Sequence, residues 1–372
     1  MAQLETTAYY AFGVPLYLSL MGVERMVARR RGAPTLSLAD SVGNLSAGLG
    51  SVVVGLFLGP ALIALYDWGY THLALVQWPA GAWAPWVLAV VLTDFGHYWH
   101  HRLDHRVAAC WAVHGVHHQP VEMNFTVAMR HAWFSDLYSF PFYLPLPLLG
   151  VPTSHFFVAT TLLSFHALIT HTEHFNFPSF GVLVTPRSHI LHHARNPRYL
   201  DKNFGAMLRV WDRLFGTHVE IDPGEAPIYG TTRGYETHDG AWSQGVLVRD
   251  LLVLARRAPT LRDKLRVFTS RPGWVPPGVD FPEVSPPRRS EDIPLGTRLY
   301  VTAQFTITLA FSLFVFIPRE QYSSLFKILS TIAIIGSLLT LGGLLDGRRG
   351  AWRMEAARVA FSVGGLVALG RH

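Results

Sequence analysis

Histidine dominates the middle of this chain, where 15 of its 19 histidines fall between His97 and His193. Most of them recur at short spacings, and residues three or four apart share one face of a helix, so each group can point its imidazoles at one centre. Three clusters result: His101 with His105, His114 with His117 and His118, and His189 with His192 and His193. The fold must therefore bring three separate segments to a common polar centre.

Imidazole is a good ligand for iron, zinc, copper and nickel. With His171, which begins a His-Thr-Glu triplet, the clusters supply nine imidazoles, more than one ion can hold. A single structural zinc site closes with four ligands and usually uses cysteine, but Cys110 is the only cysteine in the chain. The histidine count therefore predicts two metal ions.

The composition indicates an integral membrane protein, because 50% of the 372 residues are hydrophobic and only 15% are charged. The net charge of +6 comes mostly from arginine, and no basic run is interleaved with aromatic residues, so we expect no nucleic-acid partner. Apolar segments long enough to enter a bilayer cover residues 9–27, 45–66, 86–99, 134–150, 156–170, 300–317, 325–344 and 359–369. The prolines in 134–150 predict that this segment is kinked or short.

Basic residues predict the orientation of these segments. Arg29, Arg30 and Arg31 follow the first segment, and residues 346–349 between the last two are also basic, so the positive-inside rule places both on the cytoplasmic side. Counting segments from there brings all three histidine clusters to the cytoplasmic face.

The predicted fold class is all-α, a multi-pass membrane protein with a histidine-rich cytoplasmic cap over a transmembrane helix bundle. We expect N-terminal transmembrane helices in residues 1–83, a metal-binding domain in 84–220, a cytoplasmic cap and proline-rich linker in 221–295, and C-terminal transmembrane helices in 296–372. Asp94 lies two turns before His101 on one helix face, so we expect it to accept a hydrogen bond from a histidine or from Arg102.

The histidine clusters and their flanking residues resemble the fatty acid hydroxylase and sterol desaturase superfamily of membrane di-iron enzymes, and within it the alkylglycerol monooxygenase subfamily. The likeness extends over nearly the whole chain. It rests on Asp94-x-x-x-Tyr98-Trp99-x-His101-Arg102-x-x-His105, Trp111-x-x-His114-x-x-His117-His118, Thr185-Pro186-x-Ser188-His189-x-x-His192-His193-x-x-Asn196 and the segment from Asp201 to Thr217.

The resemblance implies a set of site residues. Its metal ligands fall on His101, His105, His114, His117, His118, His171, His189, His192 and His193, and its flanking polar positions, our candidate catalytic residues, fall on Glu122, Asn124, Glu173 and Asn203. One position departs from the pattern: animal enzymes of the subfamily have an acidic residue after the second histidine, and this chain has Arg106. We treat Arg106 as a candidate cofactor-binding residue, and the charge reversal leaves tetrahydrobiopterin and other electron donors as alternatives.

The resemblance further implies a monooxygenase that uses two iron ions, O₂ and an electron donor to hydroxylate a C–H bond of a membrane lipid, with the ether bond of alkylglycerols as one target. A hydroxylase or desaturase of acyl chains or sterols is the alternative within the superfamily. A bis-histidine haem carrier needs only paired histidines on facing helices, and a metal transporter needs histidines along several spans; neither fits the clustered spacing. Abundant arginine, alanine and glycine favour a bacterial inner membrane, with the endoplasmic reticulum as the eukaryotic equivalent.

Overall fold

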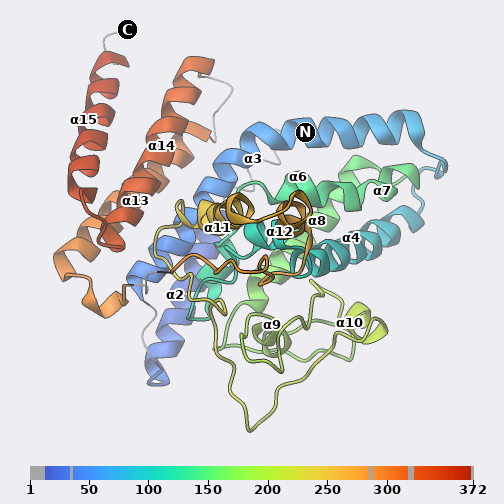
Figure 1. The fold of residues 1–372 in the computed structure, drawn as a ribbon. Helices are drawn as coiled ribbons and strands as arrows, with labels where there is room; N and C mark the ends of the chain where they lie inside the picture. Colours follow the sequence, from blue (N-terminus) through green and yellow to red (C-terminus); the bar gives the residue numbers. More distant parts are fainter. Residues whose placement is uncertain (1–12, 34–36, 285–287, 317–321, 370–372) are drawn as a thin grey trace.

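The computed structural model describes residues 13–33, 37–284, 288–316 and 322–369, and these are folded almost entirely into helices (Figure 1). Within this described part the extended backbone forms only two isolated bridges, Leu183 with Leu208 and Ala194 with Tyr229. The predicted all-α class is therefore confirmed. The helices are α2 (Val14–Arg30), α3 (Leu38–Leu73), α4 (Ala84–Asp104), α5 (Ala108–His114), η2 (Phe125–Met129), α6 (Ser135–Ser139), η3 (Phe140–Tyr143), α7 (Pro145–Leu148), α8 (Thr153–Thr170), α9 (Pro186–His192), α10 (Val210–Leu214), α11 (Ser243–Arg257), α12 (Leu261–Thr269), η4 (Ser290–Asp292), α13 (Leu295–Phe316), α14 (Ser324–Leu345) and α15 (Ala351–Leu369).

Helix α3 is much longer than the predicted span 45–66. Ser37 caps its N-terminus by accepting a hydrogen bond from the Asp40 amide, and the helix continues for 36 residues with Pro60 inside it. At 1.5 Å per residue this is about 54 Å, well beyond the roughly 30 Å of a bilayer core. Its first half is rich in small residues and packs inside the molecule, because a side chain at Gly48 would meet the Met129 carbonyl oxygen at 2.5 Å.

Three helices in the described part are long and apolar enough to cross a membrane: α3, α13 and α14. Helices α13, α14 and α15 pack side by side in chain order, and α13 and α14 also contact α3 (Figure 1). These findings confirm a multi-pass membrane protein. The predicted segments 300–317 and 325–344 correspond to α13 and α14, although residue 317 lies outside the described residues, and α15 begins earlier than the predicted segment 359–369.

The remaining apolar segments form shorter elements. Segments 86–99 and 156–170 correspond to α4 and α8, which pack against each other, and segment 9–27 corresponds in its described part to α2. Segment 134–150 is broken into α6, η3 and α7, each of five residues or fewer. Its prolines, Pro141, Pro145 and Pro147, lie at or near the starts of η3 and α7 and remove backbone donors, so this segment is no continuous span.

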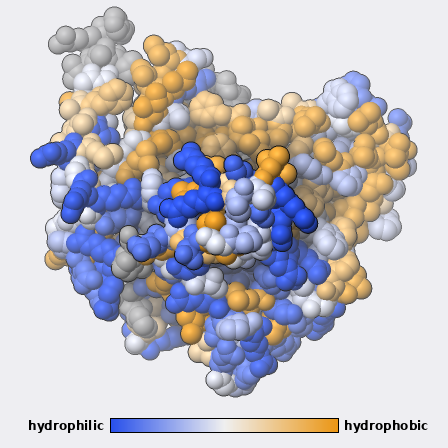
Figure 2. Space-filling model, in the orientation of Figure 1, coloured by the Kyte–Doolittle hydropathy of each residue, from blue (hydrophilic) through white to orange (hydrophobic). Residues whose placement is uncertain are grey.

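Hydrophobic and hydrophilic residues occupy different parts of the surface. Figure 2 shows hydrophobic residues along the upper and right-hand parts, where α3, α7 and α13 to α15 lie, and hydrophilic residues below, around α9 and α10. Helices α11 and α12 belong to the predicted cap and pack on α5. The histidines therefore lie where the apolar helix bundle meets the polar cap.

Candidate metal centre

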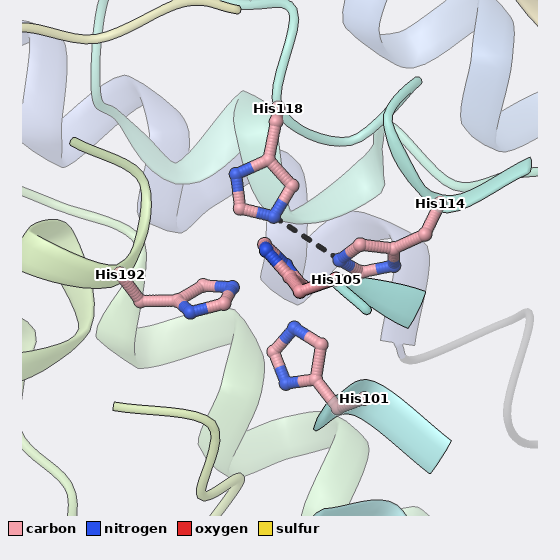
Figure 3. Close-up of side chains that lie close together, drawn as sticks. All are labelled: His101, His105, His114, His118 and His192. Atoms are coloured by element: carbon pink, nitrogen blue, oxygen red, sulfur yellow. Dashed lines mark hydrogen bonds between the residues drawn. The ribbon is translucent and has the colours of Figure 1, made fainter. Parts of the chain in front are cut away.

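The structure brings all nine predicted histidines into two adjoining groups. His101, His105, His114, His118 and His192 form the five-histidine cluster, and His117, His171, His189 and His193 form the four-histidine cluster. Within each cluster the potential ligand nitrogens all lie within 4.8 Å of one another. Figure 3 shows the five rings of the first cluster converging from α4, α5 and the segments that follow α5 and end α9.

Each HxxHH triplet is divided between the two clusters. His114 and His118 enter the five-histidine cluster and His117 the four-histidine cluster, because α5 ends at His114 and the chain turns after it. On α9, His189 and His193 share a helical face and His192 points into the other cluster. The clusters are adjacent, since the rings of His118 and His193 stack at 4.5 Å between centroids. A short stretch of chain thus serves two metal positions at once.

Helix α9 is short, and its N-terminus is held by local hydrogen bonds. Thr185 and Ser188 form a reciprocal capping box, and Pro186 occupies the first turn, where its missing amide costs nothing. These interactions fix where the helix begins and hence which way His189, His192 and His193 point.

The spacing of the ring nitrogens fits metal coordination. Two nitrogens bound at about 2.1 Å and at right angles to one ion lie about 3.0 Å apart. In the four-histidine cluster, His171 Nε2 lies 3.1 Å from His117 Nε2, 3.0 Å from His189 Nε2 and 3.2 Å from His193 Nε2. In the five-histidine cluster, His114 Nε2 lies 3.1 Å from His118 Nε2.

Three further nitrogens in the five-histidine cluster have no hydrogen-bond partner among the described residues although they are buried: Nε2 of His101, His105 and His192. A buried polar atom without a partner is costly. A bound cation would satisfy all three atoms, so the residues present fit a metal ion.

The opposite ring nitrogens are held by the backbone, which aims Nε2 at the centre. Nδ1 of His101 donates to the Phe204 carbonyl at 2.9 Å, and Nδ1 of His192 donates to the Lys202 carbonyl at 2.9 Å. His117 Nδ1 pairs in the same way with the Arg130 carbonyl at 3.1 Å. Such bonds fix the tautomer whose Nε2 lone pair is free for a metal.

Two carboxylates take the place of carbonyls at the edge of the five-histidine cluster. Asp104 is fully buried, and its Oδ2 lies 3.5 Å from Nδ1 of His114 and 3.5 Å from Nδ1 of His100. Asp201 Oδ1 lies 3.7 Å from Nδ1 of His105, and its other oxygen lies 3.5 Å from Arg106 Nε. Carboxylates in this position raise the basicity of a ligand imidazole.

Burial favours the neutral form of His118, His171, His192 and His193. Desolvation lowers the pKa of His171 to about 4, and desolvation together with neighbouring imidazoles lowers the pKa of His118, His192 and His193 well below the ordinary value. A neutral imidazole is the form that binds a metal. These ligands could therefore bind a metal ion at neutral pH without first losing protons.

The predicted catalytic residues lie around the clusters and not inside them. Glu122 lines a polar cavity of about 300 Å³ beside the first turn of α3 and accepts a hydrogen bond from the Ser37 amide. Asn124 caps η2. Glu173 is exposed and accepts a hydrogen bond from the Tyr229 hydroxyl at 2.6 Å. Asn203 links α9 to the segment after α10, because its side-chain amide donates to the Ser188 and Val219 carbonyls.

The expected role of Asp94 is wrong. Its carboxylate accepts hydrogen bonds from the Met207 amide and the Trp211 indole, both at 2.8 Å, and so fixes the segment after the last histidine cluster. Arg102 instead donates to the Tyr98 hydroxyl at 3.0 Å. Asp94 shares a helix face with His101, and this spacing predicts that it lies near the site. The spacing does not predict which segment packs on Asp94.

Arg130 is the main positioning residue that the sequence did not reveal. It is only 2% exposed, and burial lowers its pKa to about 10, so it stays charged. Its guanidinium donates to the Val116 carbonyl at 2.9 Å, inside the turn between His114 and His117, and to Gln119 Oε1 at 2.7 Å. Because its own carbonyl orients His117, Arg130 supports both clusters.

Comparison with known proteins places the chain in a family. A model of the family described as "Fatty acid hydroxylase" matches residues 86–217, the stretch that holds all nine histidines. The alkylglycerol monooxygenase of Homo sapiens is 30% identical over 365 residues, which cover 95% of this chain and 81% of the human protein. The chain belongs to the fatty acid hydroxylase family.

Other members of the family support the same placement. The alkylglycerol monooxygenase of Danio rerio is 30% identical over 368 residues, covering 95% of this chain and 81% of that protein. The ornithine lipid hydroxylase OlsE of Rhizobium tropici is 30% identical over 151 residues, covering 40% of this chain and 45% of that protein. No solved structure matches the chain. As a member of this family the protein is a membrane oxidoreductase, a lipid monooxygenase that uses O₂.

Proposed function

We propose that the protein is a di-iron monooxygenase that hydroxylates a C–H bond of a membrane lipid, and that alkylglycerols are its substrates. The observation that carries the proposal is the convergence of nine histidines, most of them buried, on two adjoining centres, with three ligand nitrogens that have no other partner among the described residues. The nine histidines are the proposed ligands. Iron fits better than zinc because oxidation of an unactivated C–H bond needs a redox metal, and bound iron would supply the activation of O₂.

The protein's own residues would hold and shield this chemistry. Backbone carbonyls of Phe204, Lys202 and Arg130 orient ligand histidines, and the cap covers the clusters and keeps water away from the reacting atoms. We assign Asn124 and Asn203 to the positioning of loops, and we retain Glu122 and Glu173 as candidates for proton transfer near the site.

The overall reaction balances with an external reductant. One oxygen atom enters the ether carbon as a hydroxyl, the other leaves as water, and the donor supplies two electrons and two protons. The resulting hemiacetal breaks down to glycerol and a fatty aldehyde. Hydroxylation of an acyl chain or a sterol is the alternative, and the match to the family described as "Fatty acid hydroxylase" favours testing acyl chains second.

The electron donor is proposed to act near Arg106. Tetrahydrobiopterin is one candidate, and a different reductant is the other. Arg106 is paired with Asp201, which also faces His105, so a donor bound there would lie beside the five-histidine cluster. We place the site on the cytoplasmic side of a bacterial inner membrane, or of the endoplasmic reticulum in a eukaryotic host, because basic residues flank the apolar segments on that side.

The direct test is turnover of defined lipids by the purified, iron-loaded protein in phospholipid nanodiscs. We expect O₂-dependent release of fatty aldehyde from an alkylglycerol with tetrahydrobiopterin or a chemical reductant, and none from the His117→Ala variant. Hydroxylated acyl chains with an intact alkylglycerol would favour the alternative substrate class. Consumption of neither lipid under any reductant would contradict the proposal.

A further inference from the structure

Helices α11 and α12 form a pair that packs directly on the helix leading into the five-histidine cluster. The Ala108 amide, at the start of α5, donates to the Ser270 carbonyl at the end of α12 at 2.8 Å. The inward faces of the pair are apolar and buried, with Leu247 and Leu254 from α11 and Val267 from α12. The position of the pair relative to His114 is therefore fixed by packing.

The outward face carries large apolar side chains that nothing in the described part covers. On α12, Leu261 is 73% exposed and Leu265 is 61% exposed, and on α11, Val248 and Leu252 are 38% and 45% exposed. Each pair is spaced four residues apart, so the two helices present continuous apolar stripes. Single exposed leucines are common on soluble surfaces, but two adjacent stripes indicate a contact surface.

The same face is strongly basic. Arg256, Arg257, Arg262 and Lys264 are exposed, and none of them forms an ion pair with a carboxylate among the described residues. The two nearby acidic residues are already engaged: the Asp263 carboxylate accepts a hydrogen bond from the Thr260 hydroxyl at 2.6 Å, and Asp250 pairs with Arg249. We call the four cations with Leu261 and Leu265 the basic apolar face.

The structure assigns the basic apolar face to the surface of an anionic bilayer. A helix with exposed leucines between arginine and lysine side chains is the pattern of an interfacial helix, whose apolar side chains enter the headgroup region while its cations meet acidic lipids. Figure 2 shows this mixed patch over α11 and α12, next to the hydrophobic band. An acidic protein partner would satisfy the cations but would leave the leucine stripe and its place beside the apolar band unexplained.

Contact of this face with the bilayer would also determine the route by which a lipid substrate reaches the five-histidine cluster. This part of the inference rests on the proposed function. With α12 in the headgroup region, α5 and His114 lie next to the lipid headgroups of one leaflet. A lipid could then reach the cluster from that leaflet without crossing water.

The test measures the depth of residue 265 in proteoliposomes that contain the full chain. Cys110 is replaced by Ser, a fluorophore is attached to Leu265→Cys, and a matched label is placed on Gly224→Cys in an exposed turn of the polar half. The vesicles contain phosphatidylcholine with or without phosphatidylglycerol, and the quenchers are headgroup-proximal doxyl lipids or aqueous iodide. None of these readings depends on metal loading or turnover, so a failed proposed function would not affect them.

We expect doxyl lipids to quench label 265 about threefold more strongly than label 224 when phosphatidylglycerol is present, with iodide showing the reverse order. Changing Arg256, Arg257, Arg262 and Lys264 to Gln should weaken the lipid quenching at 265 and remove its dependence on phosphatidylglycerol. Iodide quenching of label 265 as strong as that of label 224 would overturn the proposal and favour a water-exposed or protein-binding face. Equal lipid quenching in pure phosphatidylcholine would overturn the role of the cations.

Discussion

At the residue scale, the arrangement makes neighbouring histidines serve different metal positions. His192 and His193 are adjacent in sequence, yet His192 lies in the five-histidine cluster and His193 in the four-histidine cluster. We expect His192→Ala and His193→Ala each to lower bound iron from about two ions per chain towards one, because each removes a ligand from one cluster only.

Metal analysis of the two purified variants checks this, with His155→Ala as the control, since His155 stacks on Trp86 away from both clusters. Retention of both ions by either cluster variant would show that its histidine is not a ligand.

Arg130 provides a second residue-scale prediction. Arg130→Lys keeps the buried charge but cannot reproduce the four hydrogen bonds that the guanidinium makes to Val116, Gln119, Asn44 and Thr237. Mutation of a residue that orients metal ligands typically weakens metal affinity by about 10–100-fold, and we expect the affinity of Arg130→Lys to fall within that range.

Arg213→Lys is the matched control, since the Arg213 guanidinium bonds the Gly181 carbonyl at an exposed position. Competition with a chelator measures the affinity. Equal affinities in both variants, with both proteins folded, would exclude Arg130 as a positioning residue.

At the element scale, two glycines of α3 allow the effect of close packing on stability to be distinguished from the effect of helix propensity. A Cβ at Gly48 would meet the Met129 carbonyl oxygen at 2.5 Å, whereas a Cβ at Gly55 would meet nothing within 4 Å. We expect Gly48→Ala to destabilise the protein by roughly 1–3 kcal/mol, because the backbone of η2 must shift, and Gly55→Ala to be neutral or slightly stabilising.

Thermal unfolding of both variants in the same detergent measures the difference. Because η2 leads directly into Arg130, the Gly48 variant should also bind metal more weakly than the Gly55 variant. Identical unfolding temperatures would contradict the close packing of α3 on η2.

The sequence predicted elements better than it predicted their partners. Spacings of three and four residues identified eight of the nine histidines, because ligands close together in the sequence need no knowledge of the rest of the fold, and His171 was identified through the family's His-Thr-Glu triplet. The division of each triplet between two clusters depends on how α5, α8 and α9 pack together, which no local spacing encodes. Asp94 and Arg130 show the same limit, since each acts on a segment distant in the sequence.

The length of α3 escaped a search for apolar segments for a related reason. Its first half contains Asn44, Ser46 and several glycines, and these residues are buried against protein, so they need not be hydrophobic. A hydropathy pattern detects only the part of the helix that is apolar enough to face lipid.

At the scale of the whole molecule, the basic residues predict a topology. Reporters fused after Arg31 and after Gly350 should both be cytoplasmic, and one inserted at Ala80, between α3 and α4, should be on the opposite side. Paired enzymatic reporters, each active on one side of the membrane only, provide the measurement. If the Ala80 reporter shared the side of the Arg31 reporter, the placement of the metal centre on the cytoplasmic face would be wrong.

The proposed function depends on the two histidine clusters, so their metal content tests it most directly. The measurement is the metal content and absorption spectrum of the wild-type protein, purified from membranes of iron-supplied cells without chelators. We expect about two iron ions per chain and no haem band, because nine imidazoles are divided five and four between two adjoining centres. One ion per chain, or a haem Soret band, would contradict this expectation.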